Sequence, residues 1–299
     1  MSLSADELRE LYPFRSHFAE VSGNRLHYLD EGSGEPILCL HGNPTWSFMY
    51  RRLVTSLSDR YRVIVPDHIG CGLSDKPSPE SYSYRFSRRV EDLESLLEKL
   101  GLGENLTLVV HDWGGLIGFA YAVRHPERVS RLVVFNTTAF FPAEGGKLHW
   151  TIRFCRTSRT AAYLILRFNL FARLATFFAC RRRRMPEMVR RGYLYPYDSP
   201  DNRIGVLRFV QDIPLEPSDP SYGTLQATEE SLGRLRGKPL LICWGDRDFV
   251  FNDVFLSGWH QHFPDAQTHR YPEAGHYVLE DAFEEICTSV AKFLERHPV

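Results

Sequence analysis

The chain has 299 residues, of which 43% are hydrophobic and 24% charged, enough to bury the core of one large α/β unit or of two domains. The formal net charge of −1 provides no overall field that would attract nucleic acid. Six scattered cysteines without a Cys-x-x-Cys pair favour reduced thiols in the cytoplasm over a disulfide framework or a zinc site. Residues 1–14 contain acids and no apolar run, so we expect no signal peptide.

The first half of the chain predicts strands that alternate with helices. A hairpin is expected at 17–21 and 25–30, joined by a Ser-Gly-Asn turn. Continuous apolar runs then predict buried parallel strands at 37–40, 62–65, 106–110 and 131–135. Helical spacing of apolar residues predicts helices at 46–57, 86–100 and 114–123.

The alternation stops after the 131–135 strand and resumes near residue 235. Strands are expected at 239–244 and 267–271, and helices at 254–263 and 282–296. The pattern predicts an α/β fold with a mostly parallel sheet of eight strands, covered on both faces. Residues 141–232 are helical in pattern and rich in Arg and Tyr. We expect them to form a helical cap inserted between core segments 1–140 and 233–299.

The predicted cap contains a strongly basic segment. Residues 147–191 carry twelve Lys or Arg and one acid, Glu187, which is a local charge of +11. Within it, the apolar run 161–179 is interrupted by two arginines and an asparagine, which argues against a transmembrane helix. A cap helix with a solvated basic face is the simpler interpretation. Contact with anionic lipid or with an acidic partner is the alternative.

The run 109–115, Val-Val-His-Asp-Trp-Gly-Gly, joins a predicted strand to a predicted helix. This context resembles the nucleophile elbow of the α/β-hydrolase fold, in which Gly-x-Ser-x-Gly usually stands. Here Asp112 occupies the nucleophile position. A carboxylate that attacks carbon forms an alkyl-enzyme ester, so the substrate should carry a leaving group on saturated carbon. Taken alone, Asp112 could equally be a cap of the following helix.

An alkyl-enzyme ester needs a base that activates water for its hydrolysis. His276 lies in the loop after the last predicted strand, where the histidine of this fold belongs. The acid should follow the preceding strand, and the loop at 244–248 offers Asp246 and Asp248. We choose Asp248, because the second Asp of a Gly-Asp-Arg-Asp loop usually reaches the histidine in this fold.

The leaving group needs hydrogen-bond donors as its negative charge develops. Asn43 follows a buried strand, so its side chain should face Asp112 and converge with the indole N–H of Trp113 on one anion. A turn Asn and a core Trp are the structural alternatives. No Gly-x-Gly-x-x-Gly fingerprint and no cluster of metal ligands is visible, so we expect no cofactor and no metal.

Three motifs together resemble those of haloalkane dehalogenases. They are His-Gly-Asn-Pro-Thr at 41–45, the Pro-Asp-His-Ile-Gly-Cys-Gly-Leu-Ser-Asp-Lys-Pro run at 66–77, and His-Asp-Trp-Gly-Gly at 111–115. The resemblance implies that Asp112 displaces a halide, that Asn43 and Trp113 bind it, and that His276 activates water. The acid after the 239–244 strand, with Asn as halide donor, is similar to the third dehalogenase subfamily. The alternative acid position, 136–138, reads Asn-Thr-Thr, which strengthens the choice of Asp248.

The leading prediction is therefore hydrolysis of a carbon–halogen bond to an alcohol and a halide. The β-lactone decarboxylases of bacterial long-chain olefin biosynthesis share the core motifs and are the alternative. Cap segments 184–186, 195–198 and 208–214 look particularly like theirs. In this alternative Asp112 attacks a cis-β-lactone, and the products are an alkene and carbon dioxide.

Three further enzyme classes rank lower on the same motifs. Epoxide hydrolases usually carry Phe where Asn43 stands, and fluoroacetate dehalogenases carry Arg where Trp113 stands. A serine esterase would need Ser in the elbow. The expected partner is a small apolar halogenated or lactone substrate. The sequence leaves open whether the protein is an oligomer.

Overall fold

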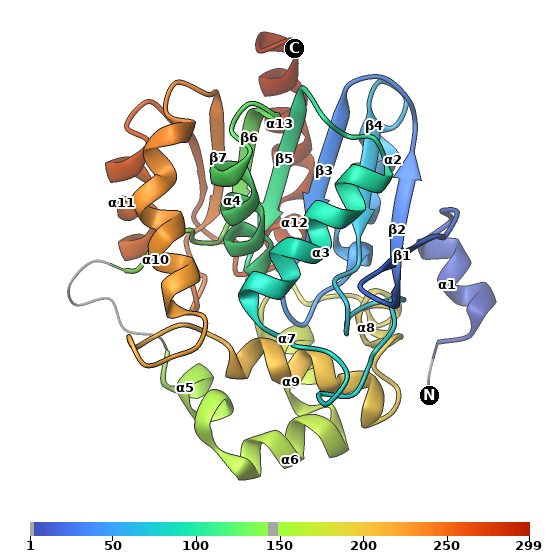
Figure 1. Ribbon diagram of the computed structural model, residues 1–299. Helices are drawn as coiled ribbons and strands as arrows, with labels where there is room; N and C mark the ends of the chain where they lie inside the picture. Colours follow the sequence, from blue (N-terminus) through green and yellow to red (C-terminus); the bar gives the residue numbers. More distant parts are fainter. Residues whose placement is uncertain (1–2, 143–148) are drawn as a thin grey trace.

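The computed structural model describes residues 3–142 and 149–299, so Lys147 of the basic segment lies outside the described residues. Eight strands form one sheet in the order β1-β2-β4-β3-β5-β6-β7-β8, and all are parallel except at β1 and β2 (Figure 1). The expectation of a mostly parallel eight-stranded sheet is confirmed. The strands are β1 (His17–Val21), β2 (Asn24–Glu31), β3 (Pro36–Leu40), β4 (Arg62–Pro66), β5 (Leu106–His111), β6 (Val129–Phe135), β7 (Leu240–Gly245) and β8 (Gln267–Tyr271).

Helices cover both faces of the sheet because alternate strand side chains point to opposite faces. Leu38 and Leu40 of β3 pack with α3, α4, α10 and α11, whereas Cys39 packs with α2, α12 and α13 on the other face. The core helices are α2 (Arg51–Leu57), α3 (Phe86–Lys99), α4 (Trp113–Arg124), α11 (Asp253–His262), α12 (Val278–Asp281) and α13 (Phe283–Arg296).

Two local features differ from the predicted elements. The predicted helix 46–57 is divided into a 3₁₀ turn, Ser47–Tyr50, and α2. A short helix, α1 (Ala5–Leu11), precedes the hairpin, where no helix is predicted. Its signal is nevertheless present in the sequence, because Ser4 and Glu7 form a reciprocal capping box.

The segment between β6 and β7 is helical, as expected. It contains α5 (Trp150–Thr157), α6 (Arg159–Phe168), α7 (Leu170–Phe178), α8 (Glu187–Leu194), α9 (Ile204–Gln211) and α10 (Tyr222–Ser231), with 3₁₀ turns at Asp201–Arg203 and Leu232–Leu235. Helices α5 to α9 lie at one end of the sheet, whereas α10 packs against α4 of the core (Figure 1). The boundaries at 140 and 232 stay predictions.

Helices α6 and α7 meet at a sharp corner. Asn169 adopts the left-handed conformation, with φ of 55°, and ends α6, and the two helix axes differ by 81°. Within the described part of the chain, no single helix is long and apolar enough to cross a membrane. The bent pair α6 and α7 does reach that length and composition when its two helices are taken together.

Candidate active site

Asp112 stands between the end of β5 and the start of α4, in the sharp turn that the sequence predicts. Its φ of 51° is in a region that residues other than glycine rarely adopt. The turn fits closely against β3, because a Cβ at Gly114 would collide with the carbonyl oxygen of Leu40. A Cβ at Gly42 would likewise collide with the Asp112 carboxylate. These two glycines explain why the motifs around Asn43 and Asp112 need small residues.

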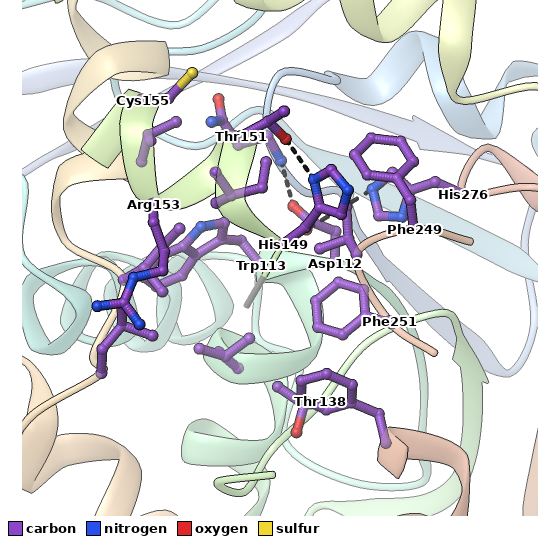
Figure 2. Close-up of a pocket in the computed structure, with 18 of the residues that line it drawn as sticks. Asp112, Trp113, Thr138, His149, Thr151, Arg153, Cys155, Phe249, Phe251 and His276 are labelled. Carbon is purple, nitrogen blue, oxygen red and sulfur yellow. Dashed lines mark hydrogen bonds and ion pairs between the residues drawn. The ribbon is translucent and has the colours of Figure 1, made fainter. Parts of the chain in front are cut away.

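The structure brings Asp112, Asp248 and His276 together at the carboxyl ends of β5, β7 and β8. Asp248 Oδ2 lies 2.8 Å from His276 Nδ1, and His276 Nε2 lies 3.8 Å from Asp112 Oδ2. Asp246 is directed elsewhere and pairs with Arg270 at 2.9 Å. Figure 2 shows Asp112 and His276 next to each other at the cavity. This is the geometry of a nucleophile, a base and an orienting acid, and it selects Asp248 over Asp246 as the residue that contacts the histidine.

The two oxygens of the Asp112 carboxylate have different surroundings. The main-chain N–H of Asn43 donates to Oδ1 at 2.6 Å, and the N–H of Trp113 also bonds the carboxylate. Oδ2 is the oxygen that faces His276. Oδ1 is therefore suited to become the polarised carbonyl of an ester, and Oδ2 is the oxygen free to attack.

Burial and charge shift the pKa values of both groups upward. Burial raises the pKa of Asp112 above its usual value, although His276 and the two N–H groups oppose this shift. Burial lowers the pKa of His276, but the charges of Asp248 and Asp112 outweigh it and raise the pKa overall. The two carboxylates therefore favour the protonated form of His276.

Asn43 and Trp113 both line the same cavity as Asp112, as the sequence predicts. The side-chain amide of Asn43 donates one hydrogen bond to the carbonyl oxygen of Val206 in α9, at 3.1 Å. Since a primary amide has two N–H groups, the second can still point to a ligand. The contact with Val206 fixes the amide to the cap, a partner that the sequence does not reveal.

The cavity has a volume of about 540 Å³ and a mainly apolar lining. Its walls come from the ends of the strands, from α5 and α7, and from the loop after β7. Lining residues of the cap and this loop include Ile152, Phe171, Leu174, Phe178, Phe249 and Phe251. Such a space suits an apolar substrate of some length, with the polar groups gathered at Asp112.

The sequence analysis assigns no role to two residues that lie beside His276. His111 lies directly before Asp112, and its Nε2 is 2.8 Å from the main-chain oxygen of His276. Burial lowers the pKa of His111 well below its usual value, and the contact with His276 connects this residue to the loop. The ring of Phe251 stacks on that of His276 with centroids 5.9 Å apart (Figure 2). Adjacency to Asp112 could have indicated His111, whereas no sequence signal indicates Phe251.

The described residues contain no group of three or more His, Cys, Asp or Glu side chains that could hold a metal ion. The expectations of no metal and no cofactor stay predictions.

Comparisons with known proteins identify the family of the fold. A family model described as alpha/beta hydrolase fold matches residues 35–283. A cis-3-alkyl-4-alkyloxetan-2-one decarboxylase of Shewanella oneidensis is 48% identical, over 96% of this chain and 90% of the relative. The protein of the same description from Xanthomonas campestris is 45% identical, over 93% and 94%.

Haloalkane dehalogenases are also similar to this chain. The one from Mycobacterium marinum is 36% identical, over 93% of both chains. The crystal structure of haloalkane dehalogenase DbeA from Bradyrhizobium elkani superposes with a TM-score of 0.84 at 27% identity, covering 94% of this chain and 98% of that chain. The sequence is thus similar to two kinds of enzyme with different chemistry, and the architecture is similar to that of haloalkane dehalogenases.

Proposed function

Since this chain belongs to the α/β-hydrolase family, we propose that it is a β-lactone decarboxylase that converts a cis-3-alkyl-4-alkyloxetan-2-one into an alkene and carbon dioxide. The observation that carries this choice is the higher identity to the two decarboxylases than to the dehalogenases. It reverses the order of the two alternatives that the motifs suggest. The apolar cavity around Asp112 supports a substrate with two alkyl chains.

In the proposed first step, Oδ2 of Asp112 attacks C4 of the lactone ring. The C4–O bond breaks, and its electron pair remains on the lactone oxygen as part of a carboxylate. The side-chain N–H groups of Asn43 and Trp113 bind this new anion, in the place where a halide would bind. Asp112 is then joined to C4 as an alkyl ester whose carbonyl oxygen is held by the main-chain N–H of Asn43.

In the second step, the bond between C3 and the carboxylate carbon breaks and releases carbon dioxide. Its electron pair forms the C3=C4 double bond while the C4–O bond to Asp112 breaks and returns the carboxylate. No water and no proton is consumed. Protonated His276, held by Asp248, stabilises the departing Asp112 carboxylate. Attack inverts C4 and the elimination is anti, so a cis lactone gives a cis alkene.

Haloalkane dehalogenation is the second candidate, favoured by the position of His276 beside Asp112. There, Asp112 displaces the halide, and neutral His276 takes a proton from the water that attacks the ester. The N–H groups that bond Asp112 would stabilise the resulting oxyanion.

The deciding experiment supplies the purified protein with a synthetic cis-3,4-dialkyl-β-lactone and, separately, with a bromoalkane of matched chain length. We expect alkene and carbon dioxide from the lactone, measured by gas chromatography, with bromide release far slower. Asp112→Ala should lower alkene formation by about a thousandfold or more, because the nucleophile is lost. Rapid bromide release without alkene formation would instead identify a dehalogenase.

A further inference from the structure

The exposed large hydrophobic side chains are concentrated on three cap helices. Nine such residues are found among the described residues, and seven of them belong to α5, α6 and α7. We call these seven the aromatic face: Trp150, Phe154, Tyr163, Phe168, Leu174, Phe177 and Phe178. A concentration of this kind in one part of the surface is typical of an interaction site.

Exposed arginines also belong to these helices and to the segment that follows α7. The exposed ones in this part of the chain are Arg153, Arg159, Arg167, Arg173, Arg181, Arg182, Arg183 and Arg184. Among these eight, and counting only partners in the described residues, Arg182 alone makes an ion pair, with Glu285. The guanidinium of Arg190 lies over the ring of Phe177 at 4.4 Å. The region therefore combines apolar side chains with positive charge that the described carboxylates leave largely unmatched.

The shape of these helices suits the surface of a lipid bilayer. Helices α5 and α6 lie at the end of the molecule far from the C-terminus (Figure 1). The apolar pair α6 and α7 turns through 81°, so it does not form one straight span. Exposed aromatic and leucine side chains beside arginines on the same helices are typical of the interface between headgroups and acyl chains.

The aromatic face is continuous with the cavity. Leu174 and Phe178 are 44% and 54% exposed, and both also line the cavity that contains Asp112. Arg153 and Arg181 line it too, and both are exposed. An apolar molecule could thus move from the surface to Asp112 along apolar side chains.

We propose that the aromatic face docks onto an anionic membrane surface, so that apolar substrate enters the cavity from the lipid. The positive charge selects an anionic surface, and the aromatic side chains enter the headgroup region. This docking does not depend on which of the two reactions Asp112 performs.

A sedimentation assay tests the proposal with two kinds of vesicle, phosphatidylcholine alone and an equimolar mixture with phosphatidylglycerol. We expect the protein to sediment with the anionic vesicles and to be released by salt. Phe177→Ser with Arg190→Gln should weaken vesicle binding roughly tenfold or more. Phe18→Ser with Arg25→Gln is the matched control, because that phenylalanine is also exposed and its arginine also covers the ring, at 4.3 Å.

The tryptophans offer a second readout. Of the five in the chain, Trp150 is 71% exposed and the other four are at most 5% exposed. Adding anionic vesicles should therefore shift the intrinsic fluorescence to shorter wavelength, and Trp150→Phe should remove this shift. Circular dichroism and the melting temperature establish that each variant is folded.

Three results would overturn the proposal. They are no binding to anionic vesicles, equal loss of binding in the two double variants, and a dimer that the Phe177 variant converts to a monomer without any vesicle binding. The last result would identify the aromatic face as a contact between two copies of this chain.

Discussion

The carboxylate of Asp112 shows how backbone geometry can prepare the proposed nucleophile. Its unusual φ is held by bonds to its own carbonyl oxygen, from the N–H of Gly115 and the hydroxyl of Thr137. The N–H of Asn43 binds Oδ1, which leaves Oδ2 directed at His276. Local strain of this kind is maintained only where the surrounding contacts impose it. The turn therefore presents one carboxylate oxygen to the substrate.

At the residue scale, we predict that the two loop aspartates differ sharply in their effect. Asp248→Asn should reduce turnover by about a hundredfold or more, because His276 loses the charge and the acceptor that orient it. Asp246→Asn, which removes a pair with Arg270 near the surface, should leave turnover nearly unchanged. Steady-state kinetics on both variants check this, and equal losses would show that the 2.8 Å contact is not functional.

The pKa shifts predict different pH profiles for the two candidate reactions. As pH falls, decarboxylation should fail only through the pKa of Asp112, which burial raises above 3.8, because the reaction needs the ionised carboxylate. As pH rises, it should slow through the raised pKa of His276, whose protonated form the reaction uses. Bromoalkane hydrolysis needs neutral His276 as well as ionised Asp112. As pH falls, it should therefore fail earlier than decarboxylation, through the pKa of His276, which Asp248 and Asp112 raise above 6.5. Turnover measured across the acid range with both substrates checks this, and coincident acid limbs would contradict the water-free mechanism.

At the scale of elements, the parallel strands position the residues of the site. The loops after β3, β5, β7 and β8 carry Asn43, Asp112, Asp248 and His276, and in a parallel sheet all these strand ends meet at one edge. The cap helices then close over that edge. Their fit depends on close backbone contacts, of which the contact between α9 and the loop after β4 is one.

Gly205 of α9 provides the test of that contact. A Cβ at this position would collide with the carbonyl oxygen of Gly70, so Gly205→Ala should lower the free energy of unfolding by about 1–3 kcal/mol. Gly223→Ala in α10 is the control, because nothing lies within 4 Å of its Cβ and alanine favours a helix. Urea unfolding measures both, and equal effects would contradict the close packing of α9.

At the scale of the whole molecule, the cap is tied to the catalytic histidine loop. Buried Asp281 accepts hydrogen bonds from the main-chain N–H groups of Gly275 and Arg181, at 2.8 and 2.7 Å, and of Arg182 at 3.2 Å. The N–H of Tyr277 donates to the carbonyl oxygen of Ala179. The segment after α7 and the loop of His276 are therefore held as one unit.

Replacing Asp281 should loosen this connection. Both carboxylate oxygens of Asp281 accept hydrogen bonds, whereas Asn has only one acceptor oxygen and would place its NH₂ group against a main-chain N–H. Asp281→Asn should therefore lower the free energy of unfolding by about 1–3 kcal/mol. Turnover should fall with it, since Gly275 precedes His276. Asp253→Asn, at a side chain that is 72% exposed, is the control and should change stability by less than about 1 kcal/mol. Thermal unfolding and kinetics check both variants, and an unchanged Asp281 variant would contradict a cap–loop link.

The sequence by itself determined the sheet, because buried parallel strands are continuous apolar runs that can be recognised locally, as at 37–40 and 106–110. It also placed Asp112 in its turn, because a strand, a small-residue helix and the residue between them are neighbours in the chain. The choice between the two candidate reactions came from sequence identity to known relatives and not from the motifs, since both reactions use the same motifs.

Only the tertiary structure decided which groups touch across long stretches of chain. Only Arg247 lies between Asp246 and Asp248, yet their contacts differ because one side chain points to the surface and the other to His276. The bond from Asn43 to Val206 joins residues of core and cap. The exposure of Trp150 likewise depends on how the cap packs. These contacts join segments that are distant in the chain, and local sequence patterns do not predict which distant segments come together.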